Sequence, residues 1–222
     1  MKPTQIKRLT VSAVMLALAT VLAAVCALIP FLNLPMGGCI TLASMLPIVI
    51  VSYMYGIKWG LFTSFTYAII QIIMDLCLGV SGSTVMALFM PNSDDYMGIV
   101  AAISILVLDY LVAYTVLGLG GLFRNRFESK GRALVLGILV ALGLRYLTHV
   151  ISGYIFYGAW AEWWFSQESL GAFGQKILSV FSGKFLALIY SICYNGFYMI
   201  PDIIITILVS LPISQLRQVK KQ

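Results

Sequence analysis

The sequence predicts an all-α integral membrane protein with six transmembrane helices and a ligand pocket inside the helical bundle. Of its 222 residues, 61% are hydrophobic and only 10% are charged, whereas soluble domains carry roughly 25% charged residues. Polar side chains nevertheless interrupt three apolar segments, around Asp109, Arg145 and Asn195. An ionised group at mid-membrane depth costs on the order of 3 kcal/mol, so such residues usually face a cavity and serve a function. We expect residues 1–222 to form a single membrane domain.

Six apolar segments are placed as transmembrane helices, because a bilayer span needs roughly 17 to 25 residues. They lie at about 8–29, 43–56, 59–79, 97–123, 131–156 and 182–212. The second is short for a full span and is expected to be tilted or partly re-entrant. No internal repeat is evident, which disfavours a secondary transporter built from inverted repeats.

Basic residues gather at alternate ends of these helices. They are Lys2, Lys7, Arg8, Lys58, Arg124, Arg126, Lys130, Arg132, Arg217, Lys220 and Lys221. The connection at 30–42 has no Lys or Arg, and 80–96 carries only acidic charges. The positive-inside bias therefore predicts that both termini are cytoplasmic and that three connections lie outside. The same asymmetry accounts for the net charge of +6, so the expected surroundings are a lipid bilayer and no nucleic acid.

The fifth predicted helix carries a polar face. Arg145, His149 and Gly153 recur at intervals of four residues, Tyr157 continues this line, and Tyr146 flanks it. The structural alternative is that Arg145 snorkels or pairs with an acid and that His149 bonds a carbonyl. Arg145 lies too near the middle of the helix to snorkel easily, which favours a binding site, and glycine at 153 would let a flat ligand approach the backbone.

Two other helices carry candidate site residues. Asp109, in the middle of the fourth helix, is an ion-pair partner of Arg145, a counter-charge for a cationic ligand, or both, with the ligand and Arg145 sharing one network. Tyr110 beside it offers a hydroxyl. On the third helix, Tyr67 is a candidate on the same face as Asp75. For Asp75, near the outer end, simple exposure and a role in the site are both open.

The last helix and the segment before it are rich in aromatic residues. Tyr190 and the deeper Asn195 are candidates on the last helix, whereas Asp202 is left unassigned. Trp160 and Trp163 form either an interfacial belt or a lid that stacks on an aromatic or cationic ligand. The four cysteines show no C-x-x-C spacing, so neither a metal nor a cofactor is expected.

Small residues line the first helix, including Ala13 and Ala17. Alanines four residues apart let two membrane helices approach closely. The spacing indicates either packing within the bundle or a docking face for another membrane subunit.

The most distinctive stretches are LDYLVAYTVLGLGGLFRNR (108–126), LRYLTHVISGYIFY (144–157), YSICYNG (190–196), GGCITLASMLPI (37–48) and YGIKWGL (55–61). Over nearly its whole length the chain resembles the thiamine-specific substrate-binding (S) components of energy-coupling factor (ECF) transporters, of prokaryotic plasma membranes. This resemblance implies six helices with a vitamin pocket near the outer face. It also implies a binding subunit without catalytic activity.

Residue by residue, the resemblance assigns the pocket. The acidic-Tyr pair that meets the thiazolium falls on Asp109 and Tyr110, with Asp where Glu is expected. The basic-Tyr-x-x-His stretch and the close-approach glycine fall on Arg145, Tyr146, His149 and Gly153. The other implied positions are Tyr157 with Trp160 or Trp163 for stacking, Tyr190 and Asn195 on the last helix, and Ala13 and Ala17 for docking.

The resemblance further implies a transport cycle. Thiamine would be captured from outside under loops at 30–42 and 157–180. The subunit would then dock onto a transmembrane coupling subunit, and two ATPase subunits would drive release inside.

Rival interpretations are an S component for another vitamin or a thiamine precursor, and a stand-alone secondary transporter. A third is an intramembrane serine protease, because Gly79-Val80-Ser81-Gly82 matches G-x-S-G and His149 would be its base. Ser81 lies in a Gly/Ser-rich turn better interpreted as a loop, so this rival is disfavoured.

Overall fold

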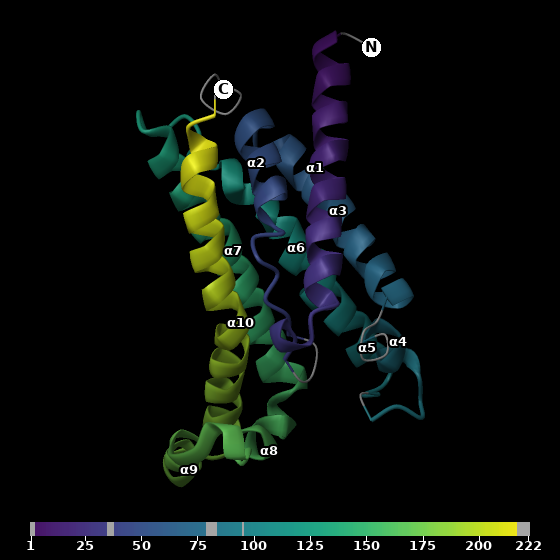
Figure 1. Cartoon of the computed structure of the whole chain (residues 1–222). Helices are drawn as coiled ribbons and strands as arrows, with labels where there is room; N and C mark the ends of the chain where they lie inside the picture. Colours follow the sequence, from purple (N-terminus) through teal and green to yellow (C-terminus); the bar gives the residue numbers. More distant parts are fainter. Residues whose placement is uncertain (1–2, 35–37, 79–83, 95, 217–222) are drawn as a thin grey trace.

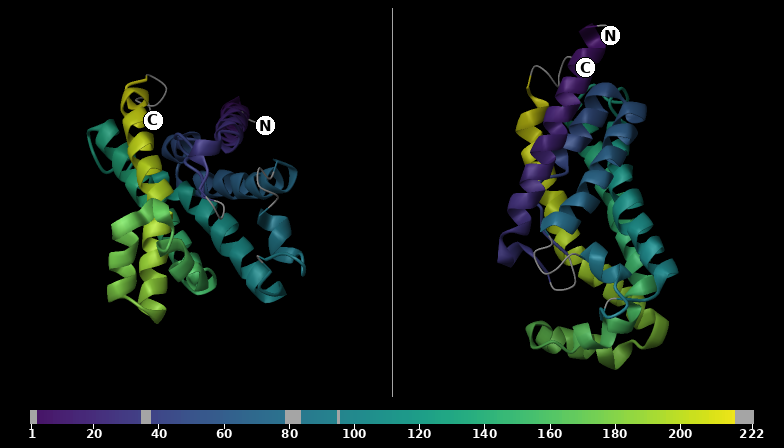
Figure 2. Two further views of the ribbon diagram at one scale, coloured as in Figure 1. Left: turned by 60° about the horizontal axis from the view of Figure 1, so that its bottom comes forward. Right: turned by 90° about the vertical axis from the view of Figure 1, so that its right-hand side faces the viewer.

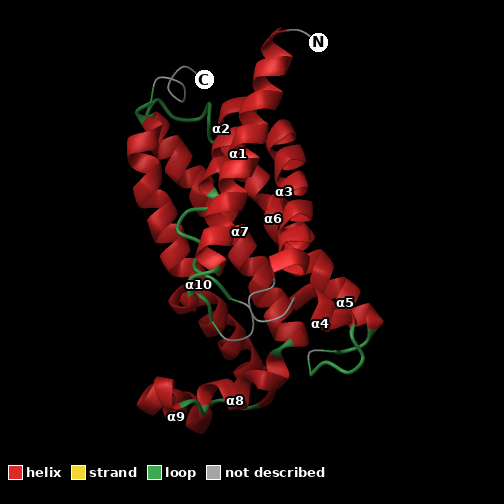
Figure 3. Ribbon diagram, turned by 45° about the vertical axis from the view of Figure 1, so that its right-hand side comes forward, coloured by secondary structure: helices red, strands yellow, loops and turns green. Residues whose placement is uncertain are grey.

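The computed structural model describes residues 3–34, 38–78, 84–94 and 96–216, and within them the regular structure is helical. Figure 3 shows helices throughout the described chain, joined by short connections. Among the described residues, five helices are long and apolar enough to cross a membrane: Thr4–Ala27, Ile57–Cys77, Ile99–Gly121, Lys130–Phe156 and Gly183–Ser214. The remaining apolar helix, Leu46–Tyr55, has only 10 residues.

The helices follow the apolar segments of the sequence closely. The long elements are α1 (Pro3–Ala27), α2 (Leu46–Tyr55), α3 (Ile57–Leu78), α7 (Lys130–Phe156) and α10 (Gly183–Ser214). The segment expected at 97–123 is a composite of α5 (Ile99–Ile105), the π-helical η3 (Leu106–Val112), α6 (Ala113–Thr115) and the 3-10 helix η4 (Val116–Gly121). Shorter elements are η1 (Pro30–Leu32), α4 (Thr84–Phe89), η5 (Gly158–Trp160), α8 (Ala161–Phe165), η6 (Glu168–Leu170) and α9 (Gly171–Val180).

The short helix α2 lies at the centre of the bundle. Every residue from Leu46 to Met54 is buried, and α2 contacts α1, α3, η4 and α7. A helix that is apolar on all sides is stable only when it is surrounded. Glycines of η4 make this close packing feasible, since a Cβ at Gly121 would overlap the backbone of Ser52.

The start of α1 and the end of α10 lie at the same end of the bundle, and α8 and α9 lie at the other end (Figure 1). Figure 2 shows α8 and α9 lying across that far end from a second direction. The helices α7 and α10 pack along each other and are joined through this far segment. In contrast, α1 packs only against one side of the bundle, mainly α2 and α3.

Candidate ligand-binding site

A cavity opens between α3, the composite helix, α7, α10 and the connection before α2. Eight of the residues predicted from sequence line it: Asp109, Tyr110, Arg145, His149, Gly153, Tyr157, Tyr190 and Asn195. On α7 these residues lie in the half that ends at Phe156, and on α10 they lie in the half that begins at Gly183. These halves of α7 and α10 lie away from the two chain ends (Figure 1), and the cavity that their residues line lies there too.

The helical distortion η3 positions the first two of these residues. Asp109 and Tyr110 lie inside the seven-residue π-helical stretch Leu106–Val112. A π-helical turn rotates the side chains relative to an α-helix, and such turns occur frequently at functional sites. Nothing in the apolar pattern of the sequence marks this change of helical pitch.

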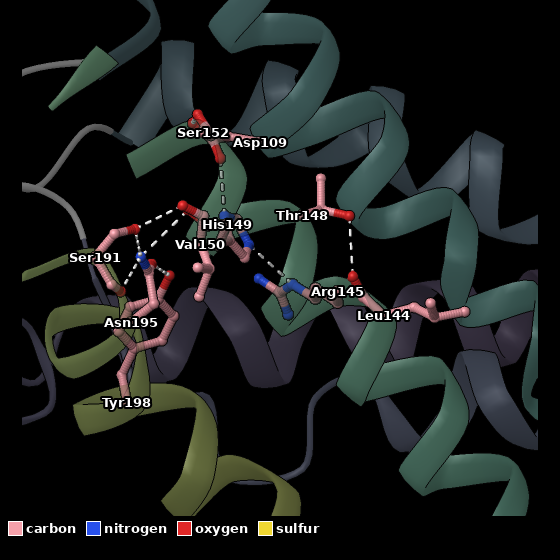
Figure 4. A network of polar contacts seen from close by, with 10 residues as sticks. All are labelled: Asp109, Leu144, Arg145, Thr148, His149, Val150, Ser152, Ser191, Asn195 and Tyr198. Carbon is pink, nitrogen blue, oxygen red and sulfur yellow. Dashed lines mark hydrogen bonds and ion pairs between the residues drawn. The ribbon is translucent and has the colours of Figure 1, made fainter. Parts of the chain in front are cut away.

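Asp109 is held by two side chains of α7. Its Oδ1 lies 2.9 Å from His149 Nδ1, and its Oδ2 accepts a hydrogen bond from the Ser152 hydroxyl at 2.7 Å. The Nε of Arg145 donates to His149 Nε2 at 3.3 Å. Because Nε2 accepts this bond, the imidazole is neutral and its proton is on Nδ1, from which it donates to Asp109. Figure 4 shows the resulting chain of contacts from Arg145 through His149 to Asp109.

The expected structural alternative, a direct ion pair between Asp109 and Arg145, is replaced by this indirect link. The Arg145 side chain is buried, with 5% of its surface exposed. Its guanidinium carbon lies 4.3 Å from the centre of the Tyr114 ring, and Nη1 contacts the Met45 sulfur. In the part of the chain that the structure describes, the guanidinium forms no ion pair with a carboxylate. A cation–π contact and His149 take the place of the acid.

Asn195 forms hydrogen bonds that join α7 and α10. Its Nδ2 donates to the carbonyls of His149 at 3.2 Å and Ser191 at 2.9 Å, and its Oδ1 accepts from the Tyr198 hydroxyl at 2.7 Å. The Ser191 hydroxyl donates to the carbonyl of Val150 at 2.7 Å. These bonds, drawn in Figure 4, occupy both amide hydrogens of Asn195.

The connection before α2 forms one wall of the cavity and is fastened to α10. Asp202, fully buried on α10, accepts hydrogen bonds from the Thr41 hydroxyl at 2.8 Å and the Thr41 N–H at 3.3 Å. The N–H of Gly38 donates to the Tyr194 hydroxyl at 3.4 Å. Burial raises the pKa of the Cys39 thiol to about 12, so this cavity-lining group is uncharged at neutral pH.

Backbone strain accompanies these bonds. Leu42 and Ala43 adopt φ angles of 44° and 66°, a region that residues other than glycine rarely occupy. Such conformations persist only where surrounding contacts determine them, and they concentrate at binding sites. The role of Asp202, which the sequence left unassigned, is thus to hold this strained wall in position.

The family model for the thiamine transporter protein (Thia_YuaJ) matches residues 9–166. The chain belongs to this thiamine transporter family. It is also 29% identical over 214 residues to the thiamine transporter ThiT of Bacillus subtilis (strain 168), an alignment that covers 92% of this chain and 88% of the relative. The resemblance stated from the sequence is thereby confirmed. The chain is a multi-pass membrane protein, and its family is one of transport proteins rather than enzymes.

Within this thiamine transporter fold, four predicted residues lie outside the cavity lining. Tyr67 is fully buried behind it, where its hydroxyl donates to the carbonyl of Ala19 at 3.4 Å. Tyr146 turns away and donates to the carbonyl of Ile192 at 2.9 Å. Trp160 and Trp163 pack edge-to-face with centroids 5.9 Å apart, and Trp163 is 44% exposed.

The aromatic wall instead comes from tyrosines. Besides Tyr157 and Tyr190, the cavity is lined by Tyr114, Tyr194 and Tyr198, which sequence analysis did not select. The buried Trp164 supports this wall from behind, with ring centroids 5.6 Å from Tyr190 and 5.9 Å from Tyr194. The four-residue spacing of Tyr190, Tyr194 and Tyr198 places them on one face of α10 and could have identified them from the sequence.

Proposed function

We propose that this protein is the substrate-binding subunit for thiamine uptake, an S component of an ECF transporter. The observation that carries the proposal is a carboxylate, Asp109, fixed in an aromatic cavity by His149 and Ser152 in a member of the thiamine transporter family. A permanent thiazolium cation requires a negative charge and aromatic ring faces. The chain would bind thiamine and catalyse no reaction of its own.

Different residues of the lining would contact the two rings of thiamine. Asp109 and Tyr110 would face the thiazolium, and the tyrosines of α10 with Tyr157 would stack on the aminopyrimidine. Arg145 would meet the hydroxyethyl arm. Gly153 lets α10 pack closely against α7 at the cavity wall, because a Cβ there would overlap the Ser191 hydroxyl. Asn195 would act by keeping α7 and α10 in register, since its amide hydrogens already have protein acceptors.

The proposed orientation puts the cavity toward the outside of a prokaryotic plasma membrane. Lys58, Arg124 and Arg126 lie around one hollow. Trp59, next to Lys58, contacts Arg8 near the start of α1, and positive residues favour the cytoplasmic side. The six helices of this single domain would be α1, α2, α3, the composite helix, α7 and α10. The segment 157–180, with α8 and α9, would then cover the outer end.

The direct test is a titration of ligand-stripped protein with thiamine, followed by intrinsic tryptophan fluorescence. We expect saturable quenching, because Trp164 packs against two cavity tyrosines. Riboflavin, biotin and the isolated aminopyrimidine and thiazole halves of thiamine are the comparison ligands. A tighter response to one of these than to thiamine would assign a different vitamin or precursor.

Ser81, the nucleophile of the protease alternative, lies outside the described residues. Proteolysis abolished by Ser81→Ala would revive that alternative.

Partner docking is proposed for the face of α1 that carries Ala13 and Ala17, both of which are exposed. We expect Ala13→Trp to abolish uptake of labelled thiamine in cells that also produce the coupling subunit and its two ATPases, because the indole would hold the helices apart. Thiamine binding to the purified variant should be unchanged. Val100→Trp is the matched control, since Val100 is 75% exposed on α5, and it should leave uptake intact. Normal uptake by Ala13→Trp would contradict docking at this face.

A further inference from the structure

The cavity contains a second carboxylate that the proposed function does not use. Asp75 lines the cavity from the last turn of α3. A negative charge in the last turn of a helix is disfavoured by the helix dipole by roughly 0.3 to 1 kcal/mol. The stability of α3 therefore gives no reason for an acidic residue at this position.

Two contacts hold the Asp75 side chain. Its Oδ2 accepts a hydrogen bond from the N–H of Val85 at 2.8 Å, in the first turn of α4. The Asp75 carboxylate also interacts electrostatically with the neighbouring Tyr110 hydroxyl. Because Tyr110 directly follows Asp109, the two carboxylates are connected through one residue of η3, while Asp109 itself is held from α7. The two acids thus reach one cavity from different helices.

The charges of the described lining residues do not cancel. Asp75 and Asp109 are the acids of the lining, and Arg145 is its basic residue. His149 is neutral because its Nε2 accepts a hydrogen bond from Arg145, and Cys39 keeps its proton. The lining therefore has one formal negative charge in excess. Asp202, which lies behind Thr41, adds no positive charge.

An excess negative charge in the cavity lining favours a monocation over a neutral ligand, because opposite charges at short range attract and a neutral ring gains nothing from this attraction. We infer that Asp75 is a specificity-determining residue, whose carboxylate makes the cavity select a permanently cationic heteroaromatic ring over its neutral isostere. This inference rests on the proposed thiamine-binding function and deepens it.

The test compares two ligands in two variants. The ligands are thiamine and its neutral isostere, in which carbon replaces the positively charged nitrogen of the thiazolium. Asp75→Asn removes the charge but retains an oxygen that accepts the hydrogen bond from the Val85 N–H. We expect thiamine affinity to fall by about tenfold or more, the effect of one charge contact at an intermediate dielectric constant, and the affinity for the isostere to change by less than about twofold. Asp94→Asn is the matched control, since Asp94 is exposed and lies outside the lining.

The quantity measured is the ratio of the two affinities, which does not depend on the fraction of folded protein. An unchanged ratio, with the affinities for both ligands reduced equally or not at all, would overturn the inference. Equal reduction would make Asp75 only a cap for α4. Asp75→Ser, which retains a hydroxyl acceptor, is the second variant, and failure of both variants to fold would likewise assign a purely structural role. If the unchanged protein bound neither ligand, the proposed function itself would be wrong.

Discussion

Asp109→Asn should weaken thiamine binding by about 100-fold or more, because removing one partner of a buried charge pair costs roughly 2 to 5 kcal/mol. The asparagine oxygen would still accept a hydrogen bond from His149 Nδ1, and the asparagine NH2 would donate one to the Ser152 hydroxyl oxygen. The network around position 109 therefore keeps its geometry, and the loss reports the charge itself. Titration of both proteins with thiamine measures the difference in affinity, and thermal unfolding checks that the two proteins are equally stable.

Ser152→Ala is the graded comparison for this variant. It removes the 2.7 Å hydrogen bond to Oδ2 but leaves the carboxylate charged and bonded to His149. We expect a loss of only about three- to tenfold, in line with roughly 1 kcal/mol for one hydrogen bond. Equal affinities of Asp109→Asn and the unchanged protein would show that the carboxylate does not contact the cation, and would remove the main support for the proposed site.

The positions of the helices could be predicted from sequence because apolar length is a direct consequence of bilayer thickness. The polar residues of α7 could also be found from the properties of the bilayer, because Arg145 and His149 are unfavourable in contact with lipid. Both arguments need only composition and the helical repeat. Neither depends on how the helices pack.

The arrangement of the contacts could not be predicted in this way. The π-helical stretch around Asp109 and the strained φ angles of Leu42 and Ala43 depend on tertiary packing that no local pattern records. Asp202 is the instructive case, because its partner Thr41 lies 161 residues away in sequence. An acid following a proline was visible in the sequence, but the burial of Asp202 and its role as an acceptor required the fold. The resemblance implied Tyr157 with Trp160 or Trp163 as stacking residues, whereas the described lining contains Tyr157 and further tyrosines and neither of these tryptophans.

Gly153→Ala should both destabilise the protein and weaken thiamine binding. A Cβ at this position would overlap the Ser191 hydroxyl and would lie 3.2 Å from Asn195 Nδ2, so α7 and α10 would have to separate. Separation would break the bonds from Asn195 to the His149 carbonyl and from Ser191 to the Val150 carbonyl. Overpacking of this kind costs about 1 to 3 kcal/mol. Thermal unfolding in detergent and a thiamine titration measure the two effects.

Gly143→Ala provides the matched control on the same helix, because a Cβ there has nothing within 4 Å. It should leave binding unchanged and raise stability by up to about 1 kcal/mol, the helix preference of alanine over glycine. Adding Ser191→Ala to Gly153→Ala removes the overlapping oxygen and should restore part of the lost affinity. If Gly153→Ala behaved like Gly143→Ala, close contact between α7 and α10 at Gly153 would not be required for binding. Rescue by Ser191→Ala would instead locate the effect at this one contact, which connects the packing of two membrane helices to the position of His149 and hence to Asp109.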